Sequence, residues 1–173
     1  SLGTFGARGT IETWFKLNSN SGASKFIIYL SDTDDDPSIF LRYRIPADGL
    51  RWAYFSGGVY QADYIQDIPD VLGWHHIAYS FETNSIKAYL DGVLVNTDTS
   101  ATISNFNVIS NAIGASYGSG LASFFNGTID EVAIWNISLS SDKIAQHAGA
   151  KIIDYSQYGN NGTRNFNSTS DFG

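Results

Sequence analysis

The sequence contains no cysteine and no methionine, and only three of its 173 residues are histidine. Without cysteine, disulfides, thiolate metal sites and cysteine nucleophiles are excluded. Without methionine, the chain does not begin at an initiator residue, so we expect a processed mature chain or an excised fragment. The longest apolar runs are far shorter than the roughly 20 residues that a spanning helix needs, so no membrane span is expected.

Positive charge is also scarce in this chain. Ten lysines and arginines are scattered singly among 17 aspartates and glutamates, and the formal net charge is -7. A protein that binds nucleic acid needs a basic stripe to neutralise phosphates, so we expect no nucleic-acid partner. An acidic surface suits cations, neutral glycans or simple solubility better.

Apolar residues, in contrast, are plentiful. Hydrophobic residues make up 43% of the chain and aromatic residues 14%, which is enough for the core of a single domain. Short β-branched and aromatic runs alternate with turns rich in Gly, Asn, Asp and Ser, which is typical of an all-β sandwich. The predicted strands are residues 10–17, 25–30, 39–45, 50–55, 59–65, 74–81, 85–90, 93–97, 111–115 and 127–135. Ten strands predict two stacked sheets.

Three local patterns refine this prediction. The pair Asp91-Gly92 predicts a tight hairpin, because both central residues of a type I′ turn need positive φ. In residues 10–17, Trp14 lies on the polar face, which predicts a strand covered on both faces or a ring at a rim. Residues 139–149 combine a Ser cap, an early acid, a late His and a final Gly, and predict a short helix. Its apolar residues predict a lid on the sandwich.

Three stretches of sequence carry a family resemblance. They are TIETWFK at residues 10–16, GWHHIA at 73–78 followed by AYLDG at 88–92, and FNGTIDEVAIW at 125–135 followed by Leu139-Ser140. In this order they resemble the laminin G-like, or concanavalin A-like, jelly-roll superfamily over residues 10–150. The resemblance implies an all-β, two-sheet antiparallel β-sandwich with one short C-terminal helix. It says more about fold than about function.

The chain departs from this resemblance at its two ends. Members of the family usually carry a D-x-S-G-x-G-N-x-G segment and a strand before the first motif, whereas here a similar segment lies at residues 154–163. We therefore divide the chain into a sandwich, residues 1–150, and a tail, residues 151–173. Either the excised piece runs into a following repeat, or the tail completes a sandwich. In the second case it would fill its own sheet or that of a neighbouring subunit, since an open sheet edge invites strand addition. The donor residues would be Ile153, Tyr155, Tyr158, Thr163 and Phe166.

The same fold also occurs in glycoside hydrolases, which need paired carboxylates on one strand. The three glutamates are isolated from one another in the sequence, and none lies in an E-x-D-x-x-E pattern. His75 and His76 are adjacent, so on a strand they point to opposite faces and cannot jointly bind one metal ion. We therefore expect no enzymatic activity.

An acidic turn at residues 32–38 is the candidate cation site. Asp32, Asp34 and Asp36 place carboxylates at alternating positions, a spacing that lets several oxygens converge on Ca²⁺. Pro37 stands where the turn glycine of an EF-hand would be, so this is not an EF-hand loop. A solvated acidic turn is the alternative.

Aromatic and amide side chains supply the candidate glycan contacts. Sugar binding uses an aromatic face beside polar groups, and the candidates are Trp52, Tyr54, Tyr60 and Tyr117. Packing in the core or at its rim is the alternative for each of them. Candidate N-glycosylation sites lie at Asn126, Asn136, Asn161 and Asn167.

Together these patterns predict a non-catalytic extracellular or cell-surface module for adhesion or surface architecture. Its partners would be further copies or a neighbouring domain, joined by strand complementation into a filament. The alternative function is a carbohydrate-binding module, with or without Ca²⁺, and its partners would be glycans. A glycoside hydrolase is the least favoured function.

Overall fold

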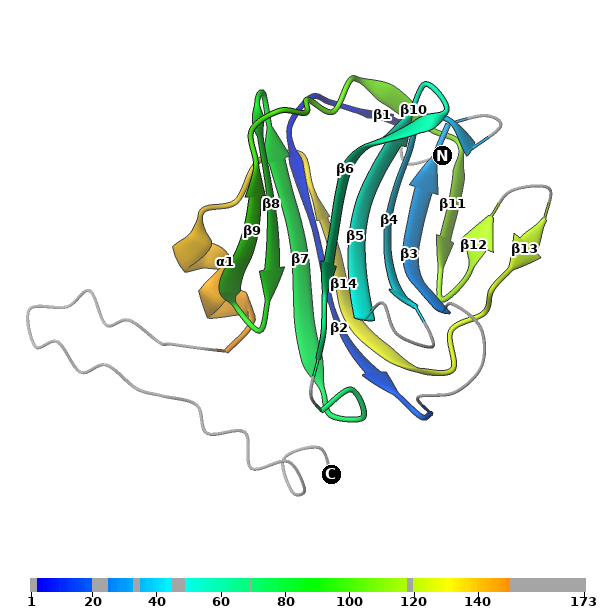
Figure 1. Ribbon diagram of the computed structural model, residues 1–173, viewed down its shortest axis with the longest axis vertical. Coiled ribbons are helices and arrows are strands. Elements are labelled where there is room, and N and C mark those ends of the chain that lie inside the picture. Colours follow the sequence, from blue (N-terminus) through cyan, green and yellow to red (C-terminus); the bar gives the residue numbers. More distant parts are fainter. Residues whose placement is uncertain are drawn as a thin grey trace, which may run out of the picture.

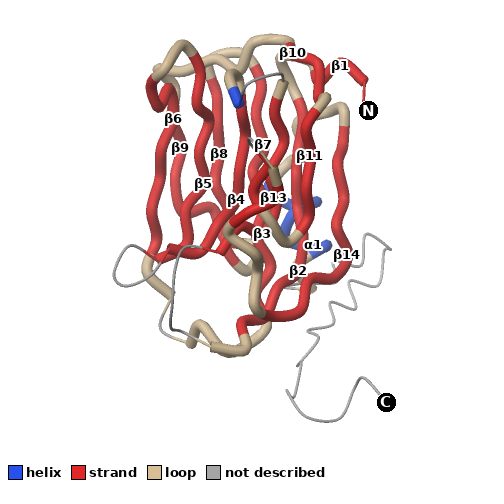
Figure 2. The backbone as a smooth tube through the Cα atoms, turned by 90° about the vertical axis from the view of Figure 1, so that its right-hand side faces the viewer, coloured by secondary structure: helices blue, strands red, loops and turns tan. Residues whose placement is uncertain are grey.

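In the computed structural model, the chain forms two five-stranded antiparallel sheets that are stacked face to face (Figure 1). The structure describes residues 3–19, 25–32, 35–44, 49–68, 70–117 and 120–149. Strands of both sheets run along the long axis of the molecule (Figure 2). The predicted fold class, a two-sheet antiparallel β-sandwich, is therefore confirmed.

Each sheet draws its strands from distant parts of the sequence. The first has the order β14 (Gly127–Trp135), β2 (Gly9–Leu17), β7 (His75–Glu82), β8 (Ser85–Leu90) and β9 (Val93–Asp98). The second has the order β11 (Ser110–Ile113), β3 (Lys25–Ser31), β4 (Ser38–Arg44), β5 (Gly49–Ser56) and β6 (Val59–Gln66). We call them the helix-side sheet and the open sheet, because α1 (Ser141–His147) lies outside the first (Figure 1).

All ten predicted strands are present, with ends that differ from the prediction by at most two residues. Four very short strands were not predicted: β1 (Gly3–Phe5) pairs with β10 (Phe106–Val108), and β12 (Ser116–Tyr117) pairs with β13 (Leu121–Ala122). Strands of two or three residues are too short to show a period of two in the sequence. A strand therefore does precede the opening motif, which the sequence analysis did not expect.

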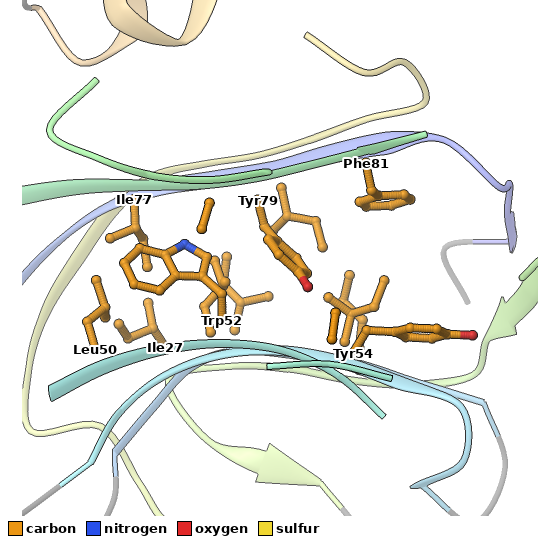
Figure 3. Packing of buried hydrophobic residues seen from close by; sticks show 14 of the residues in the cluster. Ile27, Leu50, Trp52, Tyr54, Ile77, Tyr79 and Phe81 are labelled. Carbon is orange, nitrogen blue, oxygen red and sulfur yellow. The ribbon is translucent and has the colours of Figure 1, made fainter. Parts of the chain in front are cut away.

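The core lies between the two sheets. Trp52 and Tyr54 of β5 face Ile77, Tyr79 and Phe81 of β7 across it (Figure 3). The Trp52 Nε1–H donates to the Ala78 carbonyl oxygen at 3.0 Å, so the one polar atom of this buried ring is satisfied. Alternate residues of both strands thus point inward, as the period of two predicts.

The predicted hairpin and helix are both confirmed. Asp91 and Gly92 have φ values of 49° and 77°, as a type I′ turn requires. The Ser140 side chain caps α1 by accepting from the Lys143 N–H. Ile144 of the helix is fully buried against Ala78 and Tyr89, on the outer side of the helix-side sheet. On the same outer side of β2, Glu12 is buried and Trp14 is half-buried, so the strand is covered on both faces as far as Glu12 and the Trp14 ring lies at the rim of that cover.

The predicted tail, residues 151–173, lies outside the described residues, so strand donation stays a prediction. Within the part of the chain that the structure describes, β14 pairs only with β2, and no strand pairs with its other edge. That edge is where an added strand would extend the helix-side sheet.

Candidate functional site

The outward surface of the open sheet carries a second apolar cluster, separate from the core. Its members are Phe26, Tyr29, Phe40 and Ala53, with Ala112 packed against them. They come from β3, β4, β5 and β11, and cross-strand register places Tyr29 opposite Phe40 and Phe40 opposite Ala53. We call this surface, together with its charged neighbours Arg42, Arg51 and Asp63 and the ring of Tyr60, the outer face.

Two β-bulges bring the aromatic rings of the outer face together. In an unbroken strand, Phe26 and Tyr29 would point to opposite sides, because they are three residues apart. A register shift between Phe26 and Ile28 adds one residue to β3, so both rings point outward. A second shift, next to Tyr54 and Phe55, places Tyr60 opposite Phe55 and against Phe40.

The rings of the outer face pack in mixed orientations. Tyr29 and Phe40 are nearly parallel, with an interplanar angle of 16° and centroids 6.3 Å apart. Tyr60 meets Phe40 edge-on at 6.3 Å and Phe55 edge-on at 5.3 Å. Tyr60 is 46% exposed, whereas Phe26, Tyr29 and Phe40 are buried. Tyr60 is therefore the ring of this group that a ligand can reach most directly.

Arg51 is held in place by its neighbours Asp63 and Tyr60. Its Nε and one terminal nitrogen donate to the two Asp63 carboxylate oxygens at 2.6 and 2.5 Å, and its guanidinium stacks on Tyr60 at 4.2 Å. The hydrogen bond that Arg51 donates to Asp63 is the main reason that the pKa of Arg51 is raised, against the opposing effect of burial. Arg51 thus fixes the position of the Tyr60 ring.

Arg42 lies directly opposite Arg51 in the register but is differently placed. Its guanidinium lies 5.3 Å from the Phe26 ring centroid and 5.2 Å from that of Phe40. Among the described residues, its buried Nε has no hydrogen-bond partner and no carboxylate pairs with the side chain. Burial is the main reason that the pKa of Arg42 is lowered, and the charges of Arg51 and Arg44 add to this effect. Tyr60 and Asp63 act in the opposite direction but only offset part of the lowering.

Two of the predicted glycan contacts are corrected by the structure. Trp52 and Tyr54 are 0% and 1% exposed, so neither ring can stack on a sugar at the surface. They alternate with Arg51, Ala53 and Phe55 along β5, and the inward set forms the core. Tyr60 lies on the outer face, and Tyr117 lies on β12 with 39% of its surface exposed.

In its described part, the acidic turn forms hydrogen bonds to the turn between β5 and β6. The two Asp36 carboxylate oxygens accept from the Gly57 and Gly58 N–H groups, each at 2.9 Å. Asp35 accepts from the Tyr29 hydroxyl at 2.8 Å. Asp34 lies outside the described residues, and no three His, Asp or Glu side chains gather as metal ligands elsewhere in the described chain. The Ca²⁺ site of Asp32, Asp34 and Asp36 stays a prediction.

Two further sets of predicted residues can be placed. His75 binds Asp91 and His76 lies near Glu12, so the two rings have different partners, as expected for opposite faces of β7. Asn126 and Asn136 are exposed, as a glycosylation site requires. Asn161 and Asn167 lie outside the described residues.

One pocket lies away from the outer face. It has a volume of about 560 Å³ and is lined by Thr4, Gly6, Ala7, Arg8, Glu82, Thr83 and Asn136. It joins the β1–β2 connection, the end of β7 and the residue after β14. It holds none of the predicted metal or glycan contacts, although one candidate glycosylation residue, Asn136, lies on its wall.

One family model matches most of this chain. The model of the concanavalin A-like lectin/glucanases superfamily matches residues 2–145. The chain belongs to this superfamily. This concanavalin A-like domain has no match among curated protein sequences.

Several solved structures share the fold of this concanavalin A-like domain. Domain 4 of AbnA, an extracellular arabinanase from Geobacillus stearothermophilus solved with arabinotriose, has a TM-score of 0.66 and 20% identity, over 82% of this chain and 66% of that one. The CBM40 of a Ruminococcus gnavus sialidase, solved with α2,3-sialyllactose, has a TM-score of 0.62 and 21% identity, over 82% and 83%. A pentraxin from Limulus polyphemus has a TM-score of 0.65 and 14% identity, over 86% and 72%.

At these identities the likeness shows the fold alone.

The sequence analysis identified Tyr60 but missed the other members of the outer face, including Arg42 and Arg51. Alternation along β4 and β5 could have placed these two arginines on one side of the sheet. The bulge in β3, which sets Phe26 beside Arg42, leaves no signal of that kind.

Proposed function

We propose that this domain is a non-catalytic carbohydrate-binding module and that its glycan lies on the outer face. The observation that carries the proposal is the Tyr60 ring, which is 46% exposed and held in place by Phe40, Phe55 and Arg51. A ring held in this way offers an apolar surface to a sugar without losing much side-chain entropy on binding. The guanidinium and carboxylate groups beside it supply hydrogen bonds to hydroxyls.

The fold neighbours favour this function over adhesion or filament formation. One is described as an arabinanase domain in complex with arabinotriose, another as a carbohydrate-binding module bound to sialyllactose. A third, from Bacteroides ovatus, is described as a putative carbohydrate-binding protein, with a TM-score of 0.62 and 19% identity. Because function depends on sites and not on fold, the neighbours support the proposal only together with the outer face.

We also propose that the domain acts outside the cell, where it would meet its glycan. The exposed positions of Asn126 and Asn136 fit this location. Over the described part of the chain, no helix has both the length and the apolar character needed to cross a membrane.

The proposal is tested by screening the purified domain on a glycan array, followed by calorimetry with the best ligand. We expect binding by the wild-type protein and a loss of ~10-fold or more in Tyr60→Ala, since a stacked aromatic ring contributes on the order of 1 to 2 kcal/mol. Val93→Ala, at an exposed apolar residue on β9 of the other sheet, is the control and should bind normally.

Two further arms separate the alternatives. Loss of binding in Tyr117→Ala, with normal binding by Tyr60→Ala, would move the site to the β12–β13 hairpin. Loss of binding on adding a chelator would support the predicted Ca²⁺ site at Asp32, Asp34 and Asp36. A folded wild-type protein that binds no glycan would contradict the proposed function.

A further inference from the structure

We infer that the glycan bound on the outer face carries a carboxylate, and that the Arg42 guanidinium receives it. This inference rests on the proposed glycan-binding function and names the chemical class of its ligand. Arg42 belongs to β4, the central strand of the open sheet, with two strands on either side. It therefore lies within the outer face and not at its margin.

The comparison between Arg42 and Arg51 is the first argument. The two arginines are direct cross-strand neighbours on the same surface, so their surroundings differ mainly in their partners. Arg51 has a bidentate bond to Asp63, whereas no described acid accepts a bond from Arg42. A guanidinium that is held in place without an anion is matched to an anion supplied from outside.

The setting of Arg42 between two rings is the second argument. The Phe26 and Phe40 ring centroids lie 5.3 and 5.2 Å from the guanidinium carbon, within the range of cation–π contact. A buried donor without a partner is destabilising, so an acceptor that reaches the guanidinium gains more than it would at a hydrated arginine. The lowered pKa of Arg42, caused first by burial, has the same origin. The side chain is only partly buried, so a ligand can still reach it.

The position of Tyr60 is the third argument. The Phe40 ring contacts both the Tyr60 ring and the Arg42 guanidinium. One sugar residue can therefore stack on Tyr60 while its carboxylate lies on Arg42. A guanidinium presents N–H donors in a planar fork that matches a carboxylate. Because the whole chain has a net charge of -7, no general attraction to anions is available, and selectivity must come from local groups such as this one.

The test uses an array of oligosaccharides in matched neutral, carboxylated and sulfated forms, with calorimetry on the best carboxylated and neutral pair. We expect the wild-type domain to prefer the carboxylated form by ~10-fold or more, the range of one charge-assisted hydrogen-bond pair. Arg42→Gln should remove this preference, while Arg42→Lys, which keeps the charge but lacks the fork, should restore only part of it. Arg8→Gln, an exposed arginine away from the outer face, is the matched charge control.

The outcomes separate this inference from the proposed function. Equal binding of neutral and carboxylated forms, with Arg42→Gln unchanged, would overturn the inference and leave glycan binding intact. Preference for sulfated over carboxylated forms would overturn the carboxylate assignment. No glycan binding by the folded wild-type domain would overturn both.

A structural role for Arg42 is distinguished by a second measurement. If the guanidinium only shields Phe26 and Phe40, Arg42→Gln lowers the thermal unfolding temperature and weakens neutral and carboxylated ligands equally. If Arg42→Gln does not fold, Arg42→Lys and the wild-type preference for the carboxylated form still decide the question. A wild-type protein without that preference would refute the inference in this case also.

Discussion

Glu12 shows how a single buried charge connects the helix to the sheet. It is 3% exposed, and its Oε1 accepts from the Trp135 indole N–H and the His147 Nδ1, each at 2.7 Å. The Trp135 and His147 rings stack at 5.7 Å over it. His76 Nε2 lies 3.6 Å from Oε2, which is too long for a regular hydrogen bond. One carboxylate thereby joins β2, β14 and α1.

Replacing this carboxylate tests its contribution. Burial alone would raise the pKa of Glu12, but the contacts with His76, Trp135 and His147 outweigh it and lower the pKa below its ordinary value of 4.5. A lowered folded-state pKa stabilises the fold above about pH 4.5, and this stabilisation is lost as the pH falls below it. Glu12→Gln should therefore lower the free energy of unfolding by about 1 to 3 kcal/mol at pH 7 in urea titrations.

The pH dependence supplies the control for this prediction. The difference between wild type and Glu12→Gln should shrink from pH 7 to acid pH, as the wild-type carboxylate becomes protonated through its lowered pKa. Glu131→Gln, at an exposed position, should match the wild type at both pH values. A pH-independent difference would mean that shape and not charge is responsible.

His75 is expected to show the opposite pH dependence. Its Nδ1 contacts Asp91 at 2.9 Å and its Nε2 contacts the Asp70 carbonyl oxygen at 2.6 Å, so both nitrogens face acceptors. Burial alone would lower the pKa of His75, but these contacts outweigh it and raise the pKa above the ordinary value of 6.5. The stabilisation is therefore complete below about pH 6.5 and is lost as the pH rises through the folded-state pKa.

Thermal unfolding at two pH values measures this effect. His75→Gln should destabilise the domain more at pH 6 than at pH 9, by up to about 1 kcal/mol, because Asp91 is partly exposed and screened. His147→Gln disturbs a different contact, to Glu12, and serves as the comparison. An equal effect of His75→Gln at both pH values would contradict a charged pair.

At the scale of elements, close packing of β14 on β2 explains one glycine of the family motif. Gly127 begins β14 opposite Leu17, and a Cβ at this position would overlap the Lys16 carbonyl oxygen and the Phe125 ring. Gly6 has an ordinary backbone and no atom closer than 3.9 Å to an added Cβ. The two glycines differ in the space available for a side chain and not in their backbone conformation.

Alanine at these two positions should separate steric overlap in the folded state from the restriction of the unfolded chain. Gly127→Ala should lower the free energy of unfolding by more than about 2 kcal/mol, because backbone atoms must shift to admit the methyl group. Gly6→Ala should be neutral or slightly stabilising, since it only restricts the unfolded chain. Urea titration of both variants is the measurement, and similar effects at both sites would show that β14 can move away from β2.

At the scale of the whole molecule, the tail remains the open part of the sequence prediction. The core residues identified by the structure lie between Ile11 and Ala148, on both sheets and the helix. We therefore expect a chain that ends at Gly149 to fold, as checked by circular dichroism and thermal unfolding.

Light scattering on the intact and truncated chains then tests strand donation. If the tail is donated to a neighbour, the intact chain forms assemblies and the truncated chain is monomeric. If the tail completes its own sandwich, both are monomeric and truncation lowers the unfolding temperature. Identical size and identical stability of the two chains would contradict both roles.

Much of this architecture was accessible from the sequence because it depends on short-range chemistry. Alternating residues define the strands, Asp91-Gly92 defines a hairpin, and a Ser cap with a final Gly defines α1. Each signal acts within a few residues, so it can be interpreted without knowing what the element packs against. The superfamily resemblance followed from the same local motifs.

The candidate site, in contrast, was decided by tertiary structure. Trp52, Tyr54 and Tyr60 look equivalent in the sequence, yet the first two are in the core and the third is on the outer face. A single added residue reverses the face to which a strand segment points, and the bulges in β3 and β6 do this for Phe26 and Tyr60. The sequence by itself determined which of the longer segments are strands, while only their packing determined which side of each strand meets water.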